Sequence, residues 1–495
     1  MTSPSILFID LNNFSHYPTI PVGHLIAALR SAGQRVRLYS PLAIGVSGFQ
    51  RQSRARRADR LLDPLRFWSA MTGCDSVRRA RGRLRKAMTP RNDRVRDRIV
   101  AGFGQALDWQ PDVVLVSAYT LYRAIVGDMA RICRARGIPL IVGGPSFSEP
   151  AIARHWLELA GVSAVVAGEA EPYIADLTAA AAAGRPLDRF PGTSTAATAI
   201  RPPAAPLQSL DALPVPDYSD FPWQAYPLRI VPLMTSRGCG WGACQFCSDV
   251  TGVMGRTFRS QSLSRAVEVI GTLTDRHKAR HMVFHDLKLN SNLDLWYGLL
   301  DRLPQLVRDP VWTCAVHVGN EADNGLGPEA LRAARRAGLA RVTTGLESGS
   351  QRVLNAMGKG TQAERVAAFC RDAGNAGLSV RLTAIVGSPG ETAADLAATT
   401  AFLRANAPHI ERVMVNRFSI MLGTPLAGRI ARQPERFPDI VAGGAPDLGE
   451  AIVPHRSTAP DEPGYYRALF RLLGAAHAIN RRPLRAHAQV FDGVM

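Results

Sequence analysis

The sequence predicts an α/β fold with a doubly wound parallel sheet, then a partial (β/α)6 barrel, then a small, mainly helical C-terminal region. Two observations predict it. Short apolar patterns typical of buried strands alternate with amphipathic helical patterns in two separate runs, and a Pro- and Ala-rich segment lies between the runs. We therefore expect a domain over 1–190, a linker over 191–228, a barrel over 229–430 and a C-terminal region over 431–495.

The first run begins with "SILFID" at 5–10, whose continuous apolar pattern is typical of a buried parallel strand. The amphipathic segment "GHLIAALRSAG" follows, and "RVRLYS", "DVVLVSAY", "IPLIVGGPS" and "VSAVVAGEAEP" supply further strands. Helices are expected near 121–136, 149–160 and 173–183. The short connections predict a Rossmann-like sheet, although the G-x-G-x-x-G fingerprint of dinucleotide-binding domains is absent after the first strand.

A basic insertion over 48–100 interrupts this run. The segments "RQSRARRADR" and "RRARGRLRKAMTPRNDRVRDR" make residues 51–98 strongly basic, which predicts either a solvated helical insertion or a patch for an acidic substrate or partner. The formal charge of the chain is +18, but all but four of its 59 basic residues are Arg, a skew typical of codon bias. Because aromatic residues are not interleaved with the basic ones, nucleic acid is not the expected partner.

The second run begins after the linker, where six strand patterns separated by helical patterns predict a partly closed parallel barrel. The strands are expected near 229–236, 281–286, 311–317, 341–347, 379–386 and 412–420. In the C-terminal region, "GYYRALFRLLGAAHAINRR" is the clear helical pattern.

The absence of targeting signals and the cysteine usage predict a cytoplasmic protein. No apolar run of about 18 residues is present, so no membrane span is expected. The start, "MTSPSILFIDLNNF", lacks the basic region, apolar stretch and cleavage site of a signal peptide. Of the seven cysteines, Cys74, Cys133, Cys314 and Cys370 are scattered, which indicates thiols in a reducing compartment.

The other three cysteines lie together in "RGCGWGACQFCSD", just after the first predicted barrel strand. Disulfide pairing among Cys239, Cys244 and Cys247 would leave one thiol unpaired. Structural zinc needs a fourth ligand, and no Cys or His lies at zinc-like spacing, although a distant residue could supply it. Three thiolates suit a 4Fe-4S cluster with one iron left open. The glycines let the chain wrap the cluster, and Phe246 would shield its edge.

Polar residues also follow the other predicted barrel strands, at the ends where parallel barrels place their chemistry. They are Asp286 with Asn290, His317 with Asn320, Glu347 with Ser348, "GSPGE" at 387–391, and "MLGTP". Their recurrence at successive strand ends predicts a single site at one face of the barrel.

Residues 229–425 resemble the radical S-adenosylmethionine (SAM) enzymes through the three cysteines followed by "GLESGSQRVLNAMGKG" and "AIVGSPGET". The family's usual spacing is C-x3-C-x2-C, and the C-x4-C-x2-C of this chain alters the geometry of the loop. The resemblance implies a 4Fe-4S cluster on the cysteines and SAM on the open iron. It also implies roles around SAM, with Glu347 at the ribose or amino group, Ser348 in support, Gly387 and Pro389 along the adenine, and Asp286 either nearby or capping the next helix.

Residues 5–185 resemble the cobalamin-binding domain that precedes the barrel in one class of radical SAM enzymes, which includes the class B methyltransferases. The segments "PTIPVGHLIAALRSAGQRVRLYS", "PDVVLVSAYT", "IPLIVGGPS" and "VVAGEAEP" carry this resemblance. The implied cobalamin contacts are Ser117 and Thr120 by their hydroxyls, Gly143, Gly144 and Pro145 by close backbone approach, and Gly168 with Glu169 closing the pocket. The alternative is a degenerate domain that only packs on the barrel.

No D-x-H-x-x-G motif follows the first strand, so cobalamin is expected to bind without a histidine below the cobalt. His16, the nearest candidate, is expected to be a loop residue because its spacing is wrong. An axial position left empty or to water favours reactive low-valent cobalt.

The two resemblances together imply a cobalamin-dependent radical SAM C-methyltransferase acting on an unactivated carbon, by analogy in natural-product biosynthesis. One SAM would methylate cobalt, and a second would yield the 5′-deoxyadenosyl radical that activates the substrate. The implied partners are a small-molecule or peptide substrate, for which the basic insertion permits an acidic group, and an electron donor such as flavodoxin or ferredoxin.

Three alternatives stand beside this function. The same cofactors serve rearrangement, ring contraction or cyclisation without methyl transfer. Methylthiolation would bring further N-terminal cysteines, and only Cys74 and Cys133 lie there. A non-catalytic cobalamin or redox sensor is disfavoured because the cysteines and the downstream cofactor motifs are all retained.

Overall fold

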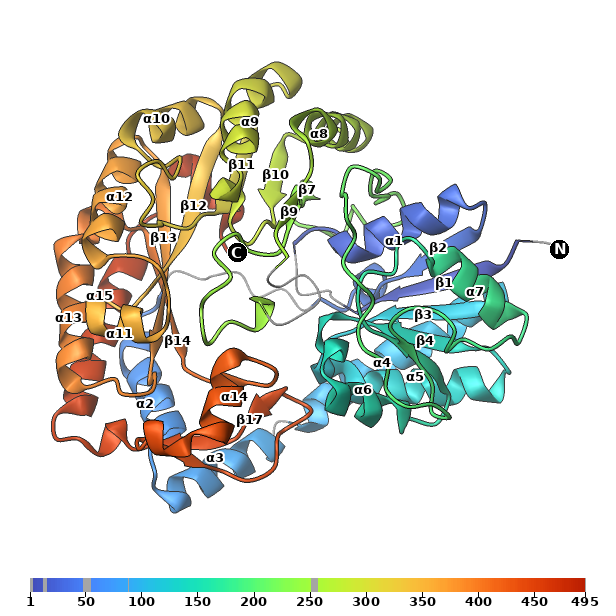
Figure 1. Cartoon of the computed structure of the whole chain (residues 1–495), viewed down its shortest axis with the longest axis horizontal. Helices are drawn as coiled ribbons and strands as arrows, with labels where there is room; N and C mark the ends of the chain where they lie inside the picture. The colour runs from blue at the N-terminus through green and yellow to red at the C-terminus, as the bar shows by residue number, and fades with distance from the viewer. Residues whose placement is uncertain (1–2, 12–15, 48–54, 88, 251–256, 495) are drawn as a thin grey trace.

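The computed structural model of the chain describes residues 3–11, 16–47, 55–87, 89–250 and 257–494. Two domains lie side by side, each built on its own six-stranded sheet, and the loop that carries the three clustered cysteines lies between them (Figure 1). The predicted fold class is confirmed.

The N-terminal sheet has the strand order β2-β1-β3-β4-β5-β6. Its strands are β1 (Ser5–Asp10), β2 (Arg35–Tyr39), β3 (Val113–Ser117), β4 (Leu140–Gly143), β5 (Val162–Val166) and β6 (Thr193–Ser194). The first five are parallel and β6 runs antiparallel to β5. Helices α1 (Ile20–Ser31), α5 (Arg123–Ala135), α6 (Pro150–Leu157) and α7 (Ile174–Ala182) connect them. Strand order reverses beside β1, which makes the carboxyl ends of β1 and β3 the switch point where ligands bind in such sheets.

The second sheet is an open parallel barrel with the order β14-β13-β12-β11-β10-β7. Its strands are β7 (Ile230–Leu233), β10 (His281–Phe284), β11 (Val311–Ala315), β12 (Leu339–Glu347), β13 (Ser379–Val386) and β14 (Arg412–Arg417), so all six predicted strands are present. The surrounding helices are α8 (Leu263–His277), α9 (Leu293–Leu306), α10 (Pro328–Arg336), α11 (Gln351–Ala356), α12 (Ala363–Asn375) and α13 (Ala393–Ala405). Buried aromatic side chains such as Trp296 and Trp312 pack between strands and helices.

The basic insertion forms α2 (Asp59–Met71), α3 (Asp75–Ala87) and α4 (Thr89–Ala106), while its residues 48–54 and 88 lie outside the described part of the chain. Helix α4 packs on α5 of the N-terminal domain, and α2 packs on a helix of the C-terminal region. The insertion therefore bridges the two domains (Figure 1).

The C-terminal region contains the predicted helix, α15 (Tyr465–Asn480), which packs on α13, β14 and α2. It also contains α14 (Pro425–Arg432) and two short antiparallel pairs, β15 (Ile420–Met421) with β17 (Ile452–Val453) and β16 (Ile440–Ala442) with β18 (His455–Ser457). At the chain end, Phe491 packs against Ile230 and Val283 and accepts a 2.7 Å hydrogen bond from buried Arg341. This segment closes the amino end of the barrel, a role that its sequence does not indicate.

The segment between the domains, residues 195–229, packs against both of them and is called the strap here. Tyr218 is fully buried and donates a hydrogen bond to the carbonyl of Pro232, 3.2 Å away. Gly23 of α1 leaves room for it, since a Cβ there would lie 2.2 Å from the Tyr218 ring. The segment thereby fixes the N-terminal domain against the barrel.

Among the described helices, none combines the length and the apolar character needed to cross a bilayer.

Candidate active site

The cysteine loop follows β7 and the short strand β8 (Ser236–Arg237), at the carboxyl face of the barrel. Cys239, Cys244 and Cys247 form no disulfide, and each is partly exposed. Gly238 and Gly242 have φ of 83° and 61°, which side chains rarely adopt, so glycine is what lets the loop turn there.

The "MGKG" segment after α11 clamps this loop. Trp241 Nε1 donates to the Gly358 carbonyl at 2.8 Å, and the Gln245 amide donates to the Met357 carbonyl at 3.0 Å. A Cβ at Gly360 would lie 2.2 Å from the Trp241 ring, so glycine is required at that contact. The family motif "GLESGSQRVLNAMGKG" therefore contains the surface that holds the cysteine loop.

Glu347 ends β12 beside this loop. Its φ is +59°, rare for a non-glycine residue, and the β12–β13 register shifts between Gly345 and Glu347. The carboxylate is 6% exposed, and it accepts from Lys359 Nζ at 2.8 Å and from Thr383 Oγ1 at 3.3 Å. The strained strand end thus turns Glu347 into the site.

Lys359 is a site residue that sequence reasoning missed. Glu347 and the thiols of Cys244 and Cys247 hold the pKa of Lys359 above its usual value, against the opposing effect of burial. Burial raises the pKa of the Cys244 thiol, and Lys359 opposes that rise. The Lys359 ammonium therefore lies near Glu347, the candidate SAM-binding carboxylate, and near two candidate cluster ligands. The sequence did offer a signal, because the chain has only four lysines and one of them lies within the motif "GLESGSQRVLNAMGKG".

Asp286, predicted beside SAM or capping a helix, lies 1% exposed after β10. It accepts hydrogen bonds from Thr235 Oγ1 at 2.8 Å and Ser236 Oγ at 2.5 Å, and burial raises its pKa. These contacts fix the backbone just before Cys239, so Asp286 holds the base of the cysteine loop.

Ser348 is fully buried, and its hydroxyl lies 3.3 Å from Thr399 Oγ1 of α13 and accepts from the Ser350 amide at 3.1 Å. It fixes the turn after Glu347, and its supporting role at SAM stays a prediction.

Two further strand-end residues tie neighbouring loops together. Asn290 bonds the backbone of His317 in both directions, each at 3.0 Å. The His317 ring stacks on Trp241 with centroids 6.3 Å apart, and its burial, with Lys359 and Lys288 nearby, lowers its pKa to about 3. His317 is therefore a neutral side chain that supports the cysteine loop.

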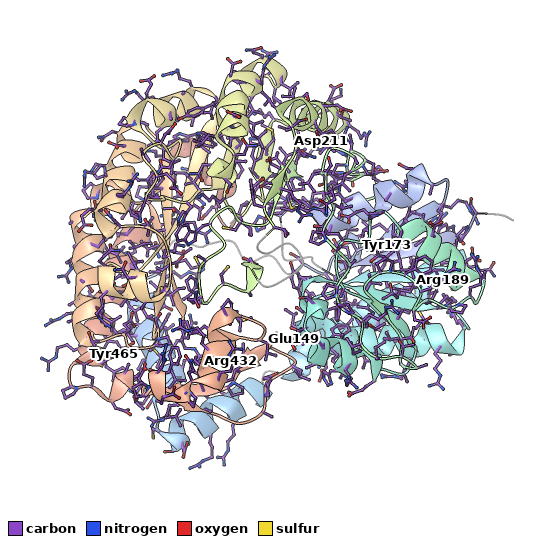
Figure 2. The ribbon with its side chains drawn as sticks, in the orientation of Figure 1. Glu149, Tyr173, Arg189, Asp211, Arg432 and Tyr465 are labelled. Atoms are coloured by element: carbon purple, nitrogen blue, oxygen red, sulfur yellow. The ribbon has the colours of Figure 1, made fainter. Side chains whose placement is uncertain are left out.

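The "GSPGE" turn follows β13. Gly387 has φ +85°, and its amide donates to Glu391 Oε2 at 2.6 Å. Tyr465 of α15, labelled in Figure 2, donates to the same oxygen at 2.9 Å. Burial raises the pKa of Glu391 to about 7. Pro389 is partly exposed at the tip of the turn. Through Tyr465, helix α15 holds the turn that the resemblance places along adenine.

The carboxyl edge of the N-terminal sheet carries the predicted cobalamin residues Ser117, Thr120, Gly143, Gly144 and Pro145, at the ends of β3 and β4. A Cβ at Gly143 would meet nothing nearer than 3.8 Å, so protein packing does not require glycine there. Gly144 differs, because a Cβ would lie 2.2 Å from the Ala118 carbonyl oxygen.

Two large apolar side chains on the loop after β3, Tyr119 and Leu121, are 48% and 64% exposed. Exposed apolar side chains beside Gly143, where the protein leaves space for a Cβ, suit a large, flat ligand.

Gly168 and Glu169, predicted to close that pocket, pack elsewhere. A Cβ at Gly168 would lie 2.7 Å from the amide nitrogen of Ala204 in the strap. Both carboxylate oxygens of Glu169 accept from Arg259 at 3.0 Å, and one also accepts from the Leu207 amide at 2.7 Å. Glu169 therefore holds the strap and the barrel against the N-terminal domain.

The cysteine loop faces the switch point of the N-terminal sheet. Partial burial and then the charges of Asp249, two residues after Cys247, and Asp10, at the end of β1, raise the pKa of Tyr119. Behind this contact, Tyr17 packs on His285 with ring centroids 4.9 Å apart, and His16 is buried beside it in sequence. The cysteine loop therefore lies near the carboxyl edge of the N-terminal sheet.

The donor set fits an iron–sulfur cluster. Within the described residues, no three His, Cys, Asp or Glu side chains converge on a single metal ion. In a cubane each ligating thiolate binds a different iron, so the ligands surround the cluster, as three thiols spread along one loop can do while the fourth iron stays open. The Lys359 cation and the turns at Gly238 and Gly242 favour an anionic cluster there.

The chain resembles known proteins in the sequence of its barrel and in its fold. Residues 233–403 match the family model described as the Radical SAM superfamily. The uncharacterized methyltransferase PH0819 of Pyrococcus horikoshii is 28% identical over 305 residues, which are 60% of this chain and 64% of that protein. The match therefore leaves about a third of that relative uncovered.

Two solved structures share the fold over nearly the whole chain. The radical SAM methyltransferase TsrM from Kitasatospora setae, with cobalamin and a 4Fe-4S cluster bound, has a TM-score of 0.66 at 15% identity, covering 96% of this chain and 89% of TsrM. The cobalamin-dependent SAM radical enzyme OxsB, with aqua-cobalamin and SAM bound, has a TM-score of 0.68 at 17% identity, covering 94% of this chain and 66% of OxsB.

Proposed function

We propose that this chain, which carries a radical SAM superfamily domain and the fold of cobalamin-dependent radical SAM enzymes, is a cobalamin-dependent C-methyltransferase that acts on an unactivated carbon. The observation that carries the proposal is the meeting of two edges. The cysteine loop lies between the two domains, and Arg237, two residues before Cys239, is tied by a 2.6 Å ion pair to Glu171 in the loop after β5 of the N-terminal sheet (Figure 1). A methyl donor and a radical source can act on one substrate only if the two lie close together.

The residues have distinct proposed roles. Cys239, Cys244 and Cys247 would hold a 4Fe-4S cluster. The Glu347–Lys359 pair would contact the polar end of SAM, because a buried carboxylate and ammonium at 2.8 Å offer both an acceptor and donors. The remaining SAM contacts would come from the backbone of Gly387 and Pro389, with Ser348 and Asp286 holding the loops.

Cobalamin would lie on the carboxyl edge of the N-terminal sheet, against Gly143 and the exposed Tyr119 and Leu121, with hydroxyl contacts from Ser117 and Thr120. When bound, the cluster with SAM supplies a hydrogen-abstracting radical, and cobalamin supplies the methyl group. The chain's part is to hold both beside the substrate and to exclude water, which its buried hydrogen-bond network around Asp286 and Glu347 supports.

The alternative uses the same cofactors for rearrangement, ring contraction or cyclisation. Nothing in the geometry distinguishes it from methyl transfer, but the products do, since only methyl transfer adds a methylene mass and releases S-adenosylhomocysteine. We propose a role in natural-product biosynthesis on a small molecule or peptide, with a flavodoxin or ferredoxin as electron donor.

The test is turnover by anaerobically reconstituted protein supplied with SAM carrying a deuterated methyl group. The substrate is sought in a metabolite extract of cells that make this protein. The proposal expects one compound of that extract to gain the labelled methyl, with S-adenosylhomocysteine and 5′-deoxyadenosine formed together. Serine at each of the three cysteines should abolish both products, whereas Cys74→Ser, outside the loop, should not. Formation of 5′-deoxyadenosine with an unlabelled product of unchanged mass would favour the alternative.

A further inference from the structure

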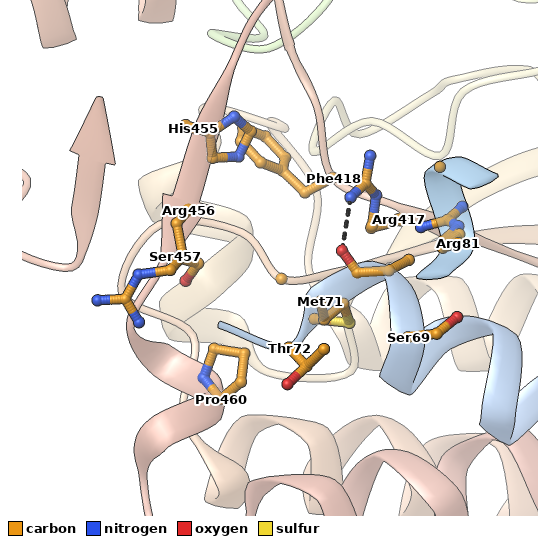
Figure 3. A pocket seen from close by; sticks show the side chains of 13 residues that line it. Ser69, Met71, Thr72, Arg81, Arg417, Phe418, His455, Arg456, Ser457 and Pro460 are labelled. Atoms are coloured by element: carbon orange, nitrogen blue, oxygen red, sulfur yellow. Dashed lines mark hydrogen bonds between the residues drawn. The ribbon is translucent and has the colours of Figure 1, made fainter. Parts of the chain in front are cut away.

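A separate cavity of about 250 Å³ lies where the basic insertion, the barrel and the C-terminal region meet (Figure 3). Its walls come from the end of α2, from α3, from the carboxyl ends of β13 and β14, and from β18. The lining residues are Ser69, Ala70, Met71, Thr72, Arg81, Gly82, Gly387, Arg417, Phe418, His455, Arg456, Ser457 and Pro460.

The lining is positively charged. Three arginines, Arg81, Arg417 and Arg456, come from three distant parts of the chain, and no Asp or Glu is among the lining residues that the structure describes. Arg456 is paired with Asp461 at 2.8 Å, whereas Arg417 donates to the carbonyl of Ala70 at 3.0 Å (Figure 3). Burial and then the charge of Arg81 lower the pKa of Arg417, and the charge of Glu450, which is not among the lining residues, opposes that lowering.

The cavity is distinct from the cysteine site. Arg417 is in register with Val386, whose side chain packs with α15 on the outer face of the barrel. Phe418 lies at the boundary, because it lines the cavity and also belongs to the apolar cluster on which Phe246 of the cysteine loop packs. Gly387 forms the shared wall, where a Cβ would lie 3.0 Å from Met71 Cε. Gly387 would therefore separate a ligand in the cavity from the proposed adenine position.

The size and lining indicate what the cavity can hold. Pockets for whole drug-sized ligands span roughly 300–1,000 Å³, so this cavity suits a charged group with a few carbons attached. Guanidinium groups match phosphate geometry and bind it by charge-assisted hydrogen bonds. The Ser457 hydroxyl adds a donor, and Met71 and Phe418 offer apolar contacts to the carbons.

We propose that this cavity binds a phosphate group, with Arg81 and Arg417 as its main ligands and Arg456 at its rim. Arginines from the insertion and from the barrel that line one cavity are stabilised when a dianion binds between them, which also locks the insertion onto the barrel. The source is either a phosphate ester, such as a phosphorylated substrate, or free phosphate. Assignment of the ester to the substrate rests on the proposed function, but phosphate binding does not.

The test is calorimetric titration of the reconstituted full-length protein with butyl phosphate at low salt. Arg81→Gln, an exposed position whose loss should not unfold the protein, is expected to weaken binding at least fivefold, as is Arg417→Gln. Arg83→Gln, on the same helix but outside the cavity, is the matched control and should change the affinity less than twofold. Should Arg417→Gln fail to fold, since it also bonds Ala70, Arg81→Gln decides alone.

Titration with inorganic phosphate distinguishes the sources. Tighter binding of butyl phosphate supports an ester whose carbons contact Met71 and Phe418, and equal binding supports free phosphate. The proposal is overturned if the wild-type protein shows no saturable binding of either probe, or if Arg83→Gln weakens it as much as Arg81→Gln. The Cys239→Ser variant should bind both probes normally, so failure of the cluster assignment leaves this test readable.

Discussion

Arg237 Nη2 and Glu171 Oε1 are 2.6 Å apart, with side chains only 4% and 8% exposed. Arg237 lies two residues before Cys239, and Glu171 lies in the loop after β5 of the N-terminal domain. The pair raises the pKa of Arg237 and lowers that of Glu171 against the opposing effect of burial. It therefore ties the cysteine loop of one domain to the sheet edge of the other.

Glu171→Gln should destabilise the protein by about 2 kcal/mol, because buried Arg237 loses the carboxylate 2.6 Å away and keeps that of Glu169 at 3.5 Å. Thermal unfolding of wild type and variant at neutral pH measures the effect. Glu329→Gln, which removes an exposed partner of Arg332, is the control and should shift the midpoint little. Equal shifts for the two variants would show that the buried pair does not join the domains.

Lys359→Met should weaken SAM binding at least tenfold, because it leaves the Glu347 carboxylate without its cation and withdraws a donor from the cofactor. Equilibrium binding of SAM to the reconstituted protein measures this loss, with iron content determined in parallel. Lys278→Met replaces a lysine that is 76% exposed and should bind SAM normally. Unchanged affinity in Lys359→Met would remove the pair from the SAM site.

Gly360→Ala should reduce iron incorporation, because its Cβ would lie 2.2 Å from the Trp241 ring that anchors the cysteine loop. Gly377→Ala is a matched control, since Gly377 also has positive φ, 85°, but its Cβ would meet nothing nearer than 3.8 Å. Both variants carry backbone strain, and only the first displaces the loop. Iron and sulfide analysis after reconstitution separates them, and equal iron contents would argue against the clamp.

Glu391→Gln should flatten the dependence of stability on pH. The pKa of Glu391 is raised from 4.5 to about 7, chiefly by burial, so the folded state holds this proton more tightly than the unfolded chain. Its contribution is complete below pH 4.5 and is lost as the pH rises through 7. The melting midpoint should therefore fall less between pH 6 and 8 in the variant than in wild type. An identical fall in the two, with exposed Glu364→Gln as reference, would contradict the raised pKa.

The strands and the cysteine loop could be predicted from the sequence because their signals are local. Buried parallel strands such as β1 and β3 need continuous apolar runs, and the thiol ligands of one cluster lie within one loop. The three predicted helices of the N-terminal domain, α5, α6 and α7, also follow from local periodicity.

The missed features are contacts between distant segments. Lys359 joins the site only because the "MGKG" turn packs on the cysteine loop. Glu169 has the position of a pocket residue, but Arg259, ninety residues later, takes both of its oxygens. The closing of the barrel by Phe491 likewise depends on a hydrogen bond from Arg341, 150 residues earlier. Patterns along the chain carry no record of such pairings.

The most direct measurement is the cofactor content of anaerobically reconstituted protein and of its Cys239→Ser, Cys244→Ser and Cys247→Ser variants. The wild type should carry about four iron, about four sulfide and one cobalamin per chain, and each variant should lose the iron while keeping the cobalamin. Zinc in place of iron, or loss of cobalamin together with the iron, would contradict two facing but separate cofactor sites.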